Sequence, residues 1–78
     1  MADKPHKGKE MLKPLGERIR DLRIKKGWSQ EAMATVAAMN AQHLGEIERG
    51  EIDSSLDALF RIATAFKITL SELFQGVV

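Results

Sequence analysis

The sequence predicts a compact all-α domain of five short helices. Apolar residues recur at intervals of three and four, as at Leu15, Ile19 and Leu22, and this spacing places them on one face of a helix. Residue types that cap helix N-termini stand before successive apolar stretches. The alternation of polar and apolar residues that marks paired strands does not occur. These features together indicate helices joined by short links.

The 78 residues have room for one domain, and its core is thin at this length. Residues 1–13 are polar, contain four lysines and show no apolar periodicity, so we expect a flexible polar arm there. The folded domain is expected over residues 14–78. The arm would either touch nucleic acid or be an idle terminus.

The first two expected helices have clear start and stop signals. Pro14 suits the first turn of a helix, and Gly27 ends that helix. A second helix begins after Ser29, a good N-cap, and Glu31 in its first turn offsets the helix dipole. The buried face of this second helix is expected to hold Met33, Ala34 and Ala37.

The last two helices follow the same logic. Ser54 and Ser55 are expected to cap a fourth helix that carries a dense set of apolar residues. Thr69 and Glu72 have the spacing of a capping box, so a fifth helix should start there. The apolar residues of the fourth helix are Leu56, Leu59, Phe60, Ile62, Ala63 and Phe66.

The third helix follows the second so closely that the two predict a helix-turn-helix. Asn40 is its expected N-cap, a few positions after Ala37, and Gly50 ends it. In such a pair the later helix is held away from the body, where it is able to contact DNA. Residues 41–49 divide into two sides at about 100° per residue. The inward side holds Leu44, Ile47 and Glu48, and the outward side holds Gln42, Gly45, Glu46 and Arg49.

The outward side carries groups that read base edges. Gln42 has the geometry for two hydrogen bonds to adenine, Glu46 for accepting from cytosine, and Arg49 for pairing with a phosphate or guanine. The same residue types cover ordinary solvated helices, and the preceding turn is what favours the base-reading interpretation. Gly45 costs about 1 kcal/mol relative to alanine in a helix, and it either permits close approach of DNA or is merely tolerated.

Glu48 faces inward beside Leu44, and a buried carboxylate needs a partner because an unpaired buried charge is heavily penalised. Arg23 lies next to Leu22 on the core-facing side of the first helix. We therefore expect an Arg23–Glu48 ion pair that ties the first helix to the third, with a structural rather than a catalytic role. Trp28 is expected to pack in the core rather than to stack on a base.

The net charge is only +1, but it is distributed unevenly. Residues 1–14 contain four basic and two acidic residues, a net charge of +2. Residues 15–26 contain five basic and two acidic residues, a net charge of +3. Residues 27–78 contain three basic and seven acidic residues, a net charge of −4. An anion-attracting surface would therefore begin in the first third of the chain. The alternative is a solvated charged helix with no such role.

The composition also argues against several function classes. The chain has no cysteine, which excludes disulfides and thiolate metal sites. The sequence has neither the apolar run of a membrane span nor that of a signal peptide, so we expect a cytoplasmic protein without a membrane partner. His6 and His43 are far apart and lack further ligands at metal spacing. With no nucleophile and base in evident reach, we expect no enzyme, no metal, no cofactor and no small-molecule ligand.

Two stretches of the chain, WSQEAMATVAAMNAQHLGEIERG and LDALFRIATAFKITLSELF, resemble the lambda-repressor-like, Cro and XRE-type family of helix-turn-helix regulators. The resemblance covers about residues 15–75. Its most specific parts are SQE at the start of the second helix, IERG at the end of the third, and the closing LSELF. It implies a lambda-repressor-like DNA-binding domain with its helix-turn-helix at the second and third helices.

The resemblance also implies roles for single residues. Gln30 matches a glutamine that contacts phosphate and braces the recognition helix, and Arg23 with Glu48 matches an internal ion pair. The positions that match base-reading residues are Ala41, Gln42 and Glu46. The positions that match contacts to the DNA backbone are Gln30, His43 and Arg49.

The chain departs from the family pattern at several positions. Ala38 stands where glycine is usual, which matters only if the backbone is left-handed there, at a cost of about 1 kcal/mol. Ala41 replaces a larger polar residue and limits readout to apolar contact such as a thymine methyl. Asp53 and Ser54 replace Asn and Pro. Glu51 and Asp53 add negative charge to a loop that is often basic, which lowers the expected DNA affinity.

These observations predict a sequence-specific, double-stranded DNA-binding regulator, a repressor or autoregulator, that reads the major groove as a homodimer. The alternative is a protein-interaction module of the same fold with weak or no DNA binding. The dimer is predicted from an apolar cluster at the end of the chain, which a monomer would have difficulty covering. The expected dimer-interface residues are Leu70, Leu73, Phe74 and Val77. The alternative for the first three is simple packing under the fourth helix.

Overall fold

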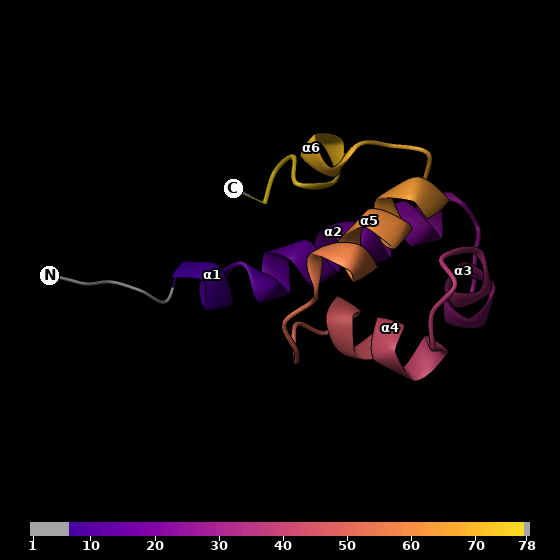
Figure 1. The fold of residues 1–78 in the computed structure, drawn as a ribbon, viewed down its shortest axis with the longest axis horizontal. Helices are drawn as coiled ribbons and strands as arrows, with labels where there is room; N and C mark the ends of the chain where they lie inside the picture. The colour runs from indigo at the N-terminus through magenta and orange to yellow at the C-terminus, as the bar shows by residue number, and fades with distance from the viewer. Residues whose placement is uncertain (1–6, 78) are drawn as a thin grey trace, which may run out of the picture.

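The computed structural model describes residues 7–77, and all its regular secondary structure is helical. Figure 1 shows the helices found in this part of the chain. They are α1 (Lys7–Glu10), α2 (Leu12–Lys25), α3 (Gln30–Val36), α4 (Ala41–Glu48), α5 (Leu56–Ala65) and α6 (Leu70–Leu73). The predicted all-α class is confirmed, and α2 to α6 are the five helices expected from the sequence.

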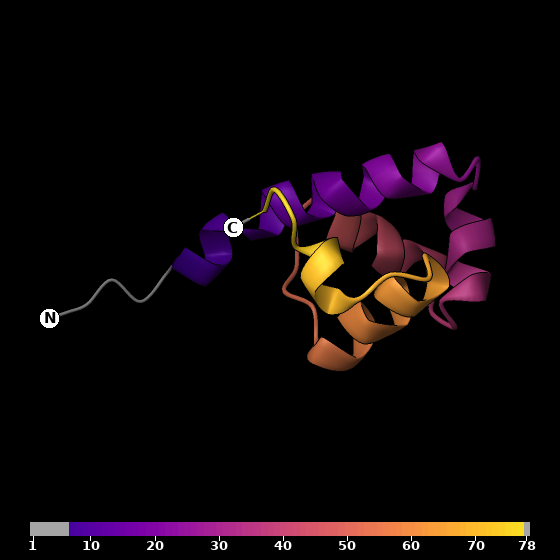
Figure 2. The same cartoon turned by 90° about the horizontal axis from the view of Figure 1, so that it is seen from above.

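Helix α4 packs against both of the helices that precede it. The longest helix, α2, runs along one long side of the molecule (Figure 2) and packs against α4. Helix α3 also packs against α4. In Figure 1, α4 and α6 lie on opposite sides of the α2 and α5 pair. One flank of α4 is therefore anchored against α2 and α3.

The core draws one large side chain from each of the helices α2 to α6. Full burial of such a side chain contributes about 1.5–3 kcal/mol, so each helix is fixed by at least one deep contact. The largest fully buried side chains are Ile19, Met33, Leu44, Ile62 and Leu73, in that order along the chain.

Local hydrogen bonds explain where four of the helices start. The side chains of Ser29, Asn40 and Ser55 each accept hydrogen bonds from backbone N–H groups in the first turn of α3, α4 and α5. Thr69 and Glu72 form both bonds of the capping box that starts α6. These groups satisfy N–H donors that have no partner inside the helix. The predicted starts are confirmed, with Ser55 as the cap of α5.

The N-terminal segment differs from the expected arm. Residues 7–10 are helical, and α2 begins at Leu12 rather than at Pro14. A Cβ on Gly50 would lie 2.8 Å from the Cα of Lys13, so the backbone at Lys13 already packs against the end of α4. The folded part thus starts before residue 14. Residues 1–6, including His6, lie outside the described residues, as does Val78.

The C-terminal segment corrects one of the predicted dimer contacts. Leu73 is fully buried inside the protomer, so it cannot reach a second chain. Arg18 on α2 closes this segment by donating to the carbonyls of Glu72 at 2.7 Å and Leu73 at 3.2 Å. The other predicted contacts, Leu70, Phe74 and Val77, are partly buried and pack against the same core. The protomer therefore covers most of this cluster itself.

Candidate nucleic-acid interface

The link between α3 and α4 is a tight turn with one left-handed residue. Ala38 has a φ of 56°, which is the conformation that favours glycine. The carbonyl of Ala38 accepts a hydrogen bond of 3.0 Å from Nη1 of Arg61 on α5. The backbone N–H of Met39 returns to the carbonyl of Ala34 at 2.8 Å. The turn is thus fixed both locally and by a helix distant in sequence.

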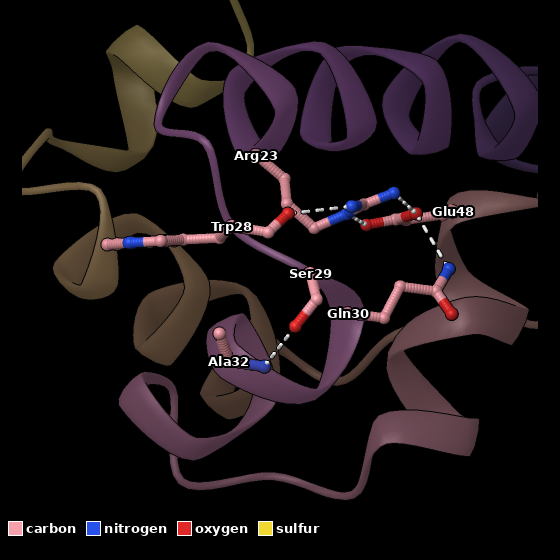
Figure 3. Close-up of polar contacts among 6 residues, drawn as sticks. All are labelled: Arg23, Trp28, Ser29, Gln30, Ala32 and Glu48. Carbon is pink, nitrogen blue, oxygen red and sulfur yellow. Dashed lines mark hydrogen bonds and ion pairs between the residues drawn. The ribbon is translucent and has the colours of Figure 1, made fainter.

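A buried polar network joins α2, α3 and α4 (Figure 3). Arg23 donates from Nε to Oε2 of Glu48 at 2.7 Å and from Nη2 to Oε1 at 3.1 Å. Nε2 of Gln30 donates to the same Oε1 at 3.0 Å. Both charged side chains are shielded, with 12% of the Arg23 side chain and 2% of the Glu48 side chain exposed. The ion pair expected from the sequence is present, and Gln30 joins it from α3.

Trp28 connects this network to the core. Its carbonyl accepts from Nη1 of Arg23 at 2.9 Å, and its ring stacks on Phe66 with the ring centroids 5.9 Å apart. Figure 3 shows Arg23 lying between the Trp28 carbonyl and the Glu48 carboxylate. No buried side-chain polar atom within residues 7–77 lacks a hydrogen-bond partner. The position and orientation of α4 are therefore fixed by satisfied contacts.

The opposite side of α4 presents the residues expected to face DNA. Gln42 and Arg49 are exposed, and Ala41, His43 and Glu46 are half-buried. Nδ1 of His43 lies 3.9 Å from Oε1 of Glu46, at the edge of ion-pair distance. The side chains named for base and backbone contacts thus lie along one helix, next to Gln30 on α3.

Gly45 is expected on the exposed side of the third helix, but in the structure it is buried. A Cβ at this position would lie 3.1 Å from Nη1 of Arg49 and 3.4 Å from Oε1 of Gln30. The side chains of Gln30 and Arg49 therefore cover Gly45. Its small size lets two expected phosphate-contacting residues lie side by side against the helix.

Arg49 is paired within the chain, which sequence reasoning missed. Its Nε and Nη2 donate to the two carboxylate oxygens of Glu51 at 2.8 and 3.2 Å. The hydrogen bond with Glu51, with the attraction of that carboxylate, raises the pKa of Arg49, and the same bond lowers the pKa of Glu51. Both side chains remain about half exposed. The sequence does carry a signal for this pair, because the oppositely charged Arg49 and Glu51 stand on either side of Gly50. Gly50 has a φ of 71° and reverses the direction of the chain there.

Gly16 is a second position that sequence reasoning missed. A Cβ on Gly16 would collide with the backbone carbonyl oxygens of Ile47 and Glu48. The backbones of α2 and α4 therefore meet without a side chain between them. This close approach is what brings Arg23 within reach of Glu48.

Comparison with known proteins classifies this arrangement. The family model described as Helix-turn-helix matches residues 19–73, a range that includes α3, the turn and α4. The chain belongs to the helix-turn-helix family. The XRE-type resemblance seen in the sequence is thereby confirmed.

Three relatives of this helix-turn-helix protein are informative. The HTH-type transcriptional regulator DdrOP3 of Deinococcus deserti is 35% identical over 63 residues, which are 81% of this chain and 49% of the relative. The chain thus spans about half the length of that regulator. The restriction-modification controller protein C.AhdI from Aeromonas hydrophila is 38% identical, with a TM-score of 0.77 over 83% of this chain and 97% of C.AhdI. An HTH_3 family transcriptional regulator from Vibrio cholerae is 26% identical, with a TM-score of 0.82 over 88% of this chain and 39% of that one.

Within residues 7–77, no group of three or more His, Asp or Glu side chains is arranged to hold a metal ion. None of the helices in this part of the chain combines the length and apolar composition needed to cross a membrane.

Proposed function

We propose that the protein is a sequence-specific regulator of transcription that binds double-stranded DNA in the cytoplasm as a homodimer. It inserts α4 into the major groove and acts as a repressor or autoregulator, without a cofactor or small-molecule ligand. One observation carries the proposal. The buried side of α4 is fixed by Leu44, Ile47 and Glu48, while Gln42 and Arg49 are exposed on the other side.

The exposed residues have complementary roles in this complex. Gln42 pairs with adenine and Glu46 with cytosine, and Ala41 contacts a thymine methyl. The DNA-backbone contacts are Gln30, His43 and Arg49. Because backbone contacts position a protein while base contacts specify sequence, the two sets predict different mutant behaviour.

Selection of bound sequences from a random DNA pool tests the proposal directly. We expect an enriched, roughly palindromic site whose half-sites lie about 34 Å apart, one turn of DNA. A pool that remains random after repeated rounds would contradict sequence-specific binding. A single unrepeated half-site would contradict reading by a dimer.

Two alanine variants test the assigned face of α4. Gln42→Ala should relax preference at one base position by about 1–3 kcal/mol. Arg49→Ala should weaken binding to all sequences alike, because phosphates carry no sequence information. Arg20→Ala, which removes an exposed arginine from α2, is the matched control. If Gln42→Ala and Arg49→Ala both bind as the wild type does, the assigned face is wrong.

The Arg49–Glu51 pair favours a second candidate, a protein-interaction module with weak or no DNA binding. Glu51 neutralises an arginine that would otherwise attract phosphate. A salt series separates the two functions. DNA affinity should fall steeply with salt because bound phosphates release counterions, whereas an interaction with a protein groove should respond weakly.

A further inference from the structure

A lysine at the start of α2 lies beside the end of α4. A Cβ on Gly50 would lie 2.8 Å from the Cα of Lys13 and 3.0 Å from its backbone nitrogen. In Figures 1 and 2 the segment that follows α4 passes the start of α2. Gly50 directly follows Arg49, which is an expected contact to the DNA backbone. Lys13 therefore stands next to the proposed DNA-binding surface, although it belongs to another helix.

The helical register places Lys13 on the outer side of the contact between α2 and α4. Successive residues turn by about 100°, so Lys13 lies about 60° around α2 from Gly16, which meets the backbone of α4. Leu15 and Ile19, which are buried in the core, lie on the other side of Gly16. The core, the α4 contact and Lys13 thus follow one another around α2. Lys13 is exposed and shares the side of the molecule to which the outward side of α4 belongs.

The charge of Lys13 differs from that of Arg49 in having no counterion nearby. Within residues 7–77, Lys13 takes part in no ion pair, not even with Glu17 one turn along α2. Arg49, by contrast, is held by Glu51 at 2.8 Å. A lysine ammonium group on its flexible stem binds phosphate as a point charge. The end of α4 therefore has one cation that is engaged within the chain and one that is available to an anion.

The length of α4 brings its C-terminal end to the wall of the major groove. Its 8 residues rise about 12 Å, which is close to the width of the major groove of B-DNA. In a helix-turn-helix the N-terminal residues of the recognition helix contact base edges. The C-terminal end is then directed toward a sugar-phosphate strand, and a cation beside Gly50 meets that strand.

We infer that the ammonium group of Lys13 binds a phosphodiester of the DNA backbone, next to the phosphate that Arg49 contacts. This contact rests on the proposed function, to which it adds a second helix at the end of α4. Of the two roles expected for residues 1–13, contact with nucleic acid is the one that Lys13 takes. Because phosphates carry no sequence information, Lys13 adds affinity for DNA and leaves the preferred sequence unchanged.

Fluorescence anisotropy of the full chain on a DNA duplex, at salt concentrations from about 50 to 200 mM, tests the contact. Lys13→Met keeps most of the apolar stem and removes the charge, so log affinity should depend less steeply on log salt, by about 0.9. The affinity ratio of wild type to variant should then shrink about three- to four-fold across this range. Lys13→Arg keeps the charge and should keep the slope. Lys25→Met is the matched control, because Lys25 is exposed at the other end of α2 and about 120° around it. Circular dichroism checks that each variant is folded.

A double variant separates a direct phosphate contact from an effect through Glu51. If Lys13 acted only by weakening the hold of Glu51 on Arg49, Lys13→Met would have no effect in a Glu51→Gln background. We expect it to lower the slope there by the same amount, about 0.9. An unchanged slope in either background overturns the inference and leaves the proposed function intact, since the wild type still binds DNA. A changed base preference in Lys13→Met also overturns it, in favour of a base contact. A wild type that binds no duplex contradicts the proposed function, and the inference with it.

Discussion

Ala38 shows how one residue is forced away from its preferred conformation by its surroundings. The left-handed conformation costs a residue with a Cβ about 1–2 kcal/mol of conformational energy, yet Ala38 has a φ of 56°. The hydrogen bond from Arg61 to its carbonyl and the packing of α3 against α4 maintain the turn. The position is therefore one where glycine would relieve strain.

We expect Ala38→Gly to stabilise the fold by about 0.5–1 kcal/mol. Glycine removes the free-energy cost of the left-handed conformation. Part of this gain is offset because glycine also raises the conformational entropy of the unfolded chain. The free energy of unfolding in urea measures it. Ala32→Gly, at an exposed position within α3, is the control and should cost about 1 kcal/mol. Equal losses in both variants would show that the turn is not strained.

Arg23 illustrates the opposite case, a residue whose removal leaves a charge without its partner. We expect Arg23→Ala to lower the free energy of unfolding by about 3–5 kcal/mol, because Glu48 would stay buried with Gln30 as its remaining donor. Arg20→Ala, at an exposed position on the same helix, should change stability by less than about 0.5 kcal/mol. A similarly small change for Arg23→Ala would mean that the network does not secure α4.

Glu51 sets how much of the Arg49 charge is available to DNA. We expect Glu51→Gln to bind DNA more tightly at neutral pH and to steepen the dependence of log affinity on log salt by about 0.9, as for one additional phosphate contact. Fluorescence anisotropy at several salt concentrations measures both changes. Glu31→Gln removes an exposed carboxylate from α3 without releasing an arginine, and its slope should match that of the wild type.

The Arg49–Glu51 pair also predicts how the DNA affinity changes with pH. Arg49 lowers the pKa of Glu51, so the pair is complete above the ordinary pKa of that carboxyl group. It is lost as the pH falls through the lowered value. The DNA affinities of the wild type and Glu51→Gln should therefore differ at neutral pH and converge in acid. A constant difference at every pH would show that Glu51 does not act by holding Arg49.

Between helices, the contact of α2 with α4 depends on the absence of a side chain at Gly16. We expect Gly16→Ala to destabilise the protein by about 1–3 kcal/mol, because the added methyl group would collide with the backbone of α4. This loss would outweigh the better helix propensity of alanine. Thermal unfolding measures it, and Ser71→Ala on the exposed face of α6 is the control. A stabilised Gly16→Ala variant would contradict the tight approach of the two helices.

Features that depend on neighbours along the chain were predictable from the sequence. The starts of α3 to α6 follow from caps within one helical turn of the groups they bind. The Arg23–Glu48 pair joins distant segments, and only the inward placing of its carboxylate made it predictable. Other features set by distant segments were not. Gly45 is covered by Gln30 from another helix, and Leu73 is buried by packing across the core. Apolar periodicity also gives no signal for α1.

For the protein as a unit, dimerisation should couple association to folding. The apolar core of a domain this small contributes limited stability, and binding to the folded state alone adds to it by mass action. We therefore expect the melting temperature of the wild type to rise with protein concentration. A wild-type melting temperature independent of concentration would indicate a protomer that unfolds on its own.

The division of α4 into two sides has a further consequence, for how such a protein acquires new targets. The contacts that hold the helix come from Leu44, Ile47 and Glu48, whereas Gln42 and Glu46 take no part in the Arg23–Gln30 network. Substitutions at Gln42 and Glu46 should therefore change the preferred operator at little cost in stability. The scaffold is evolvable in this respect, because a duplicated copy could diverge in target sequence while keeping its fold.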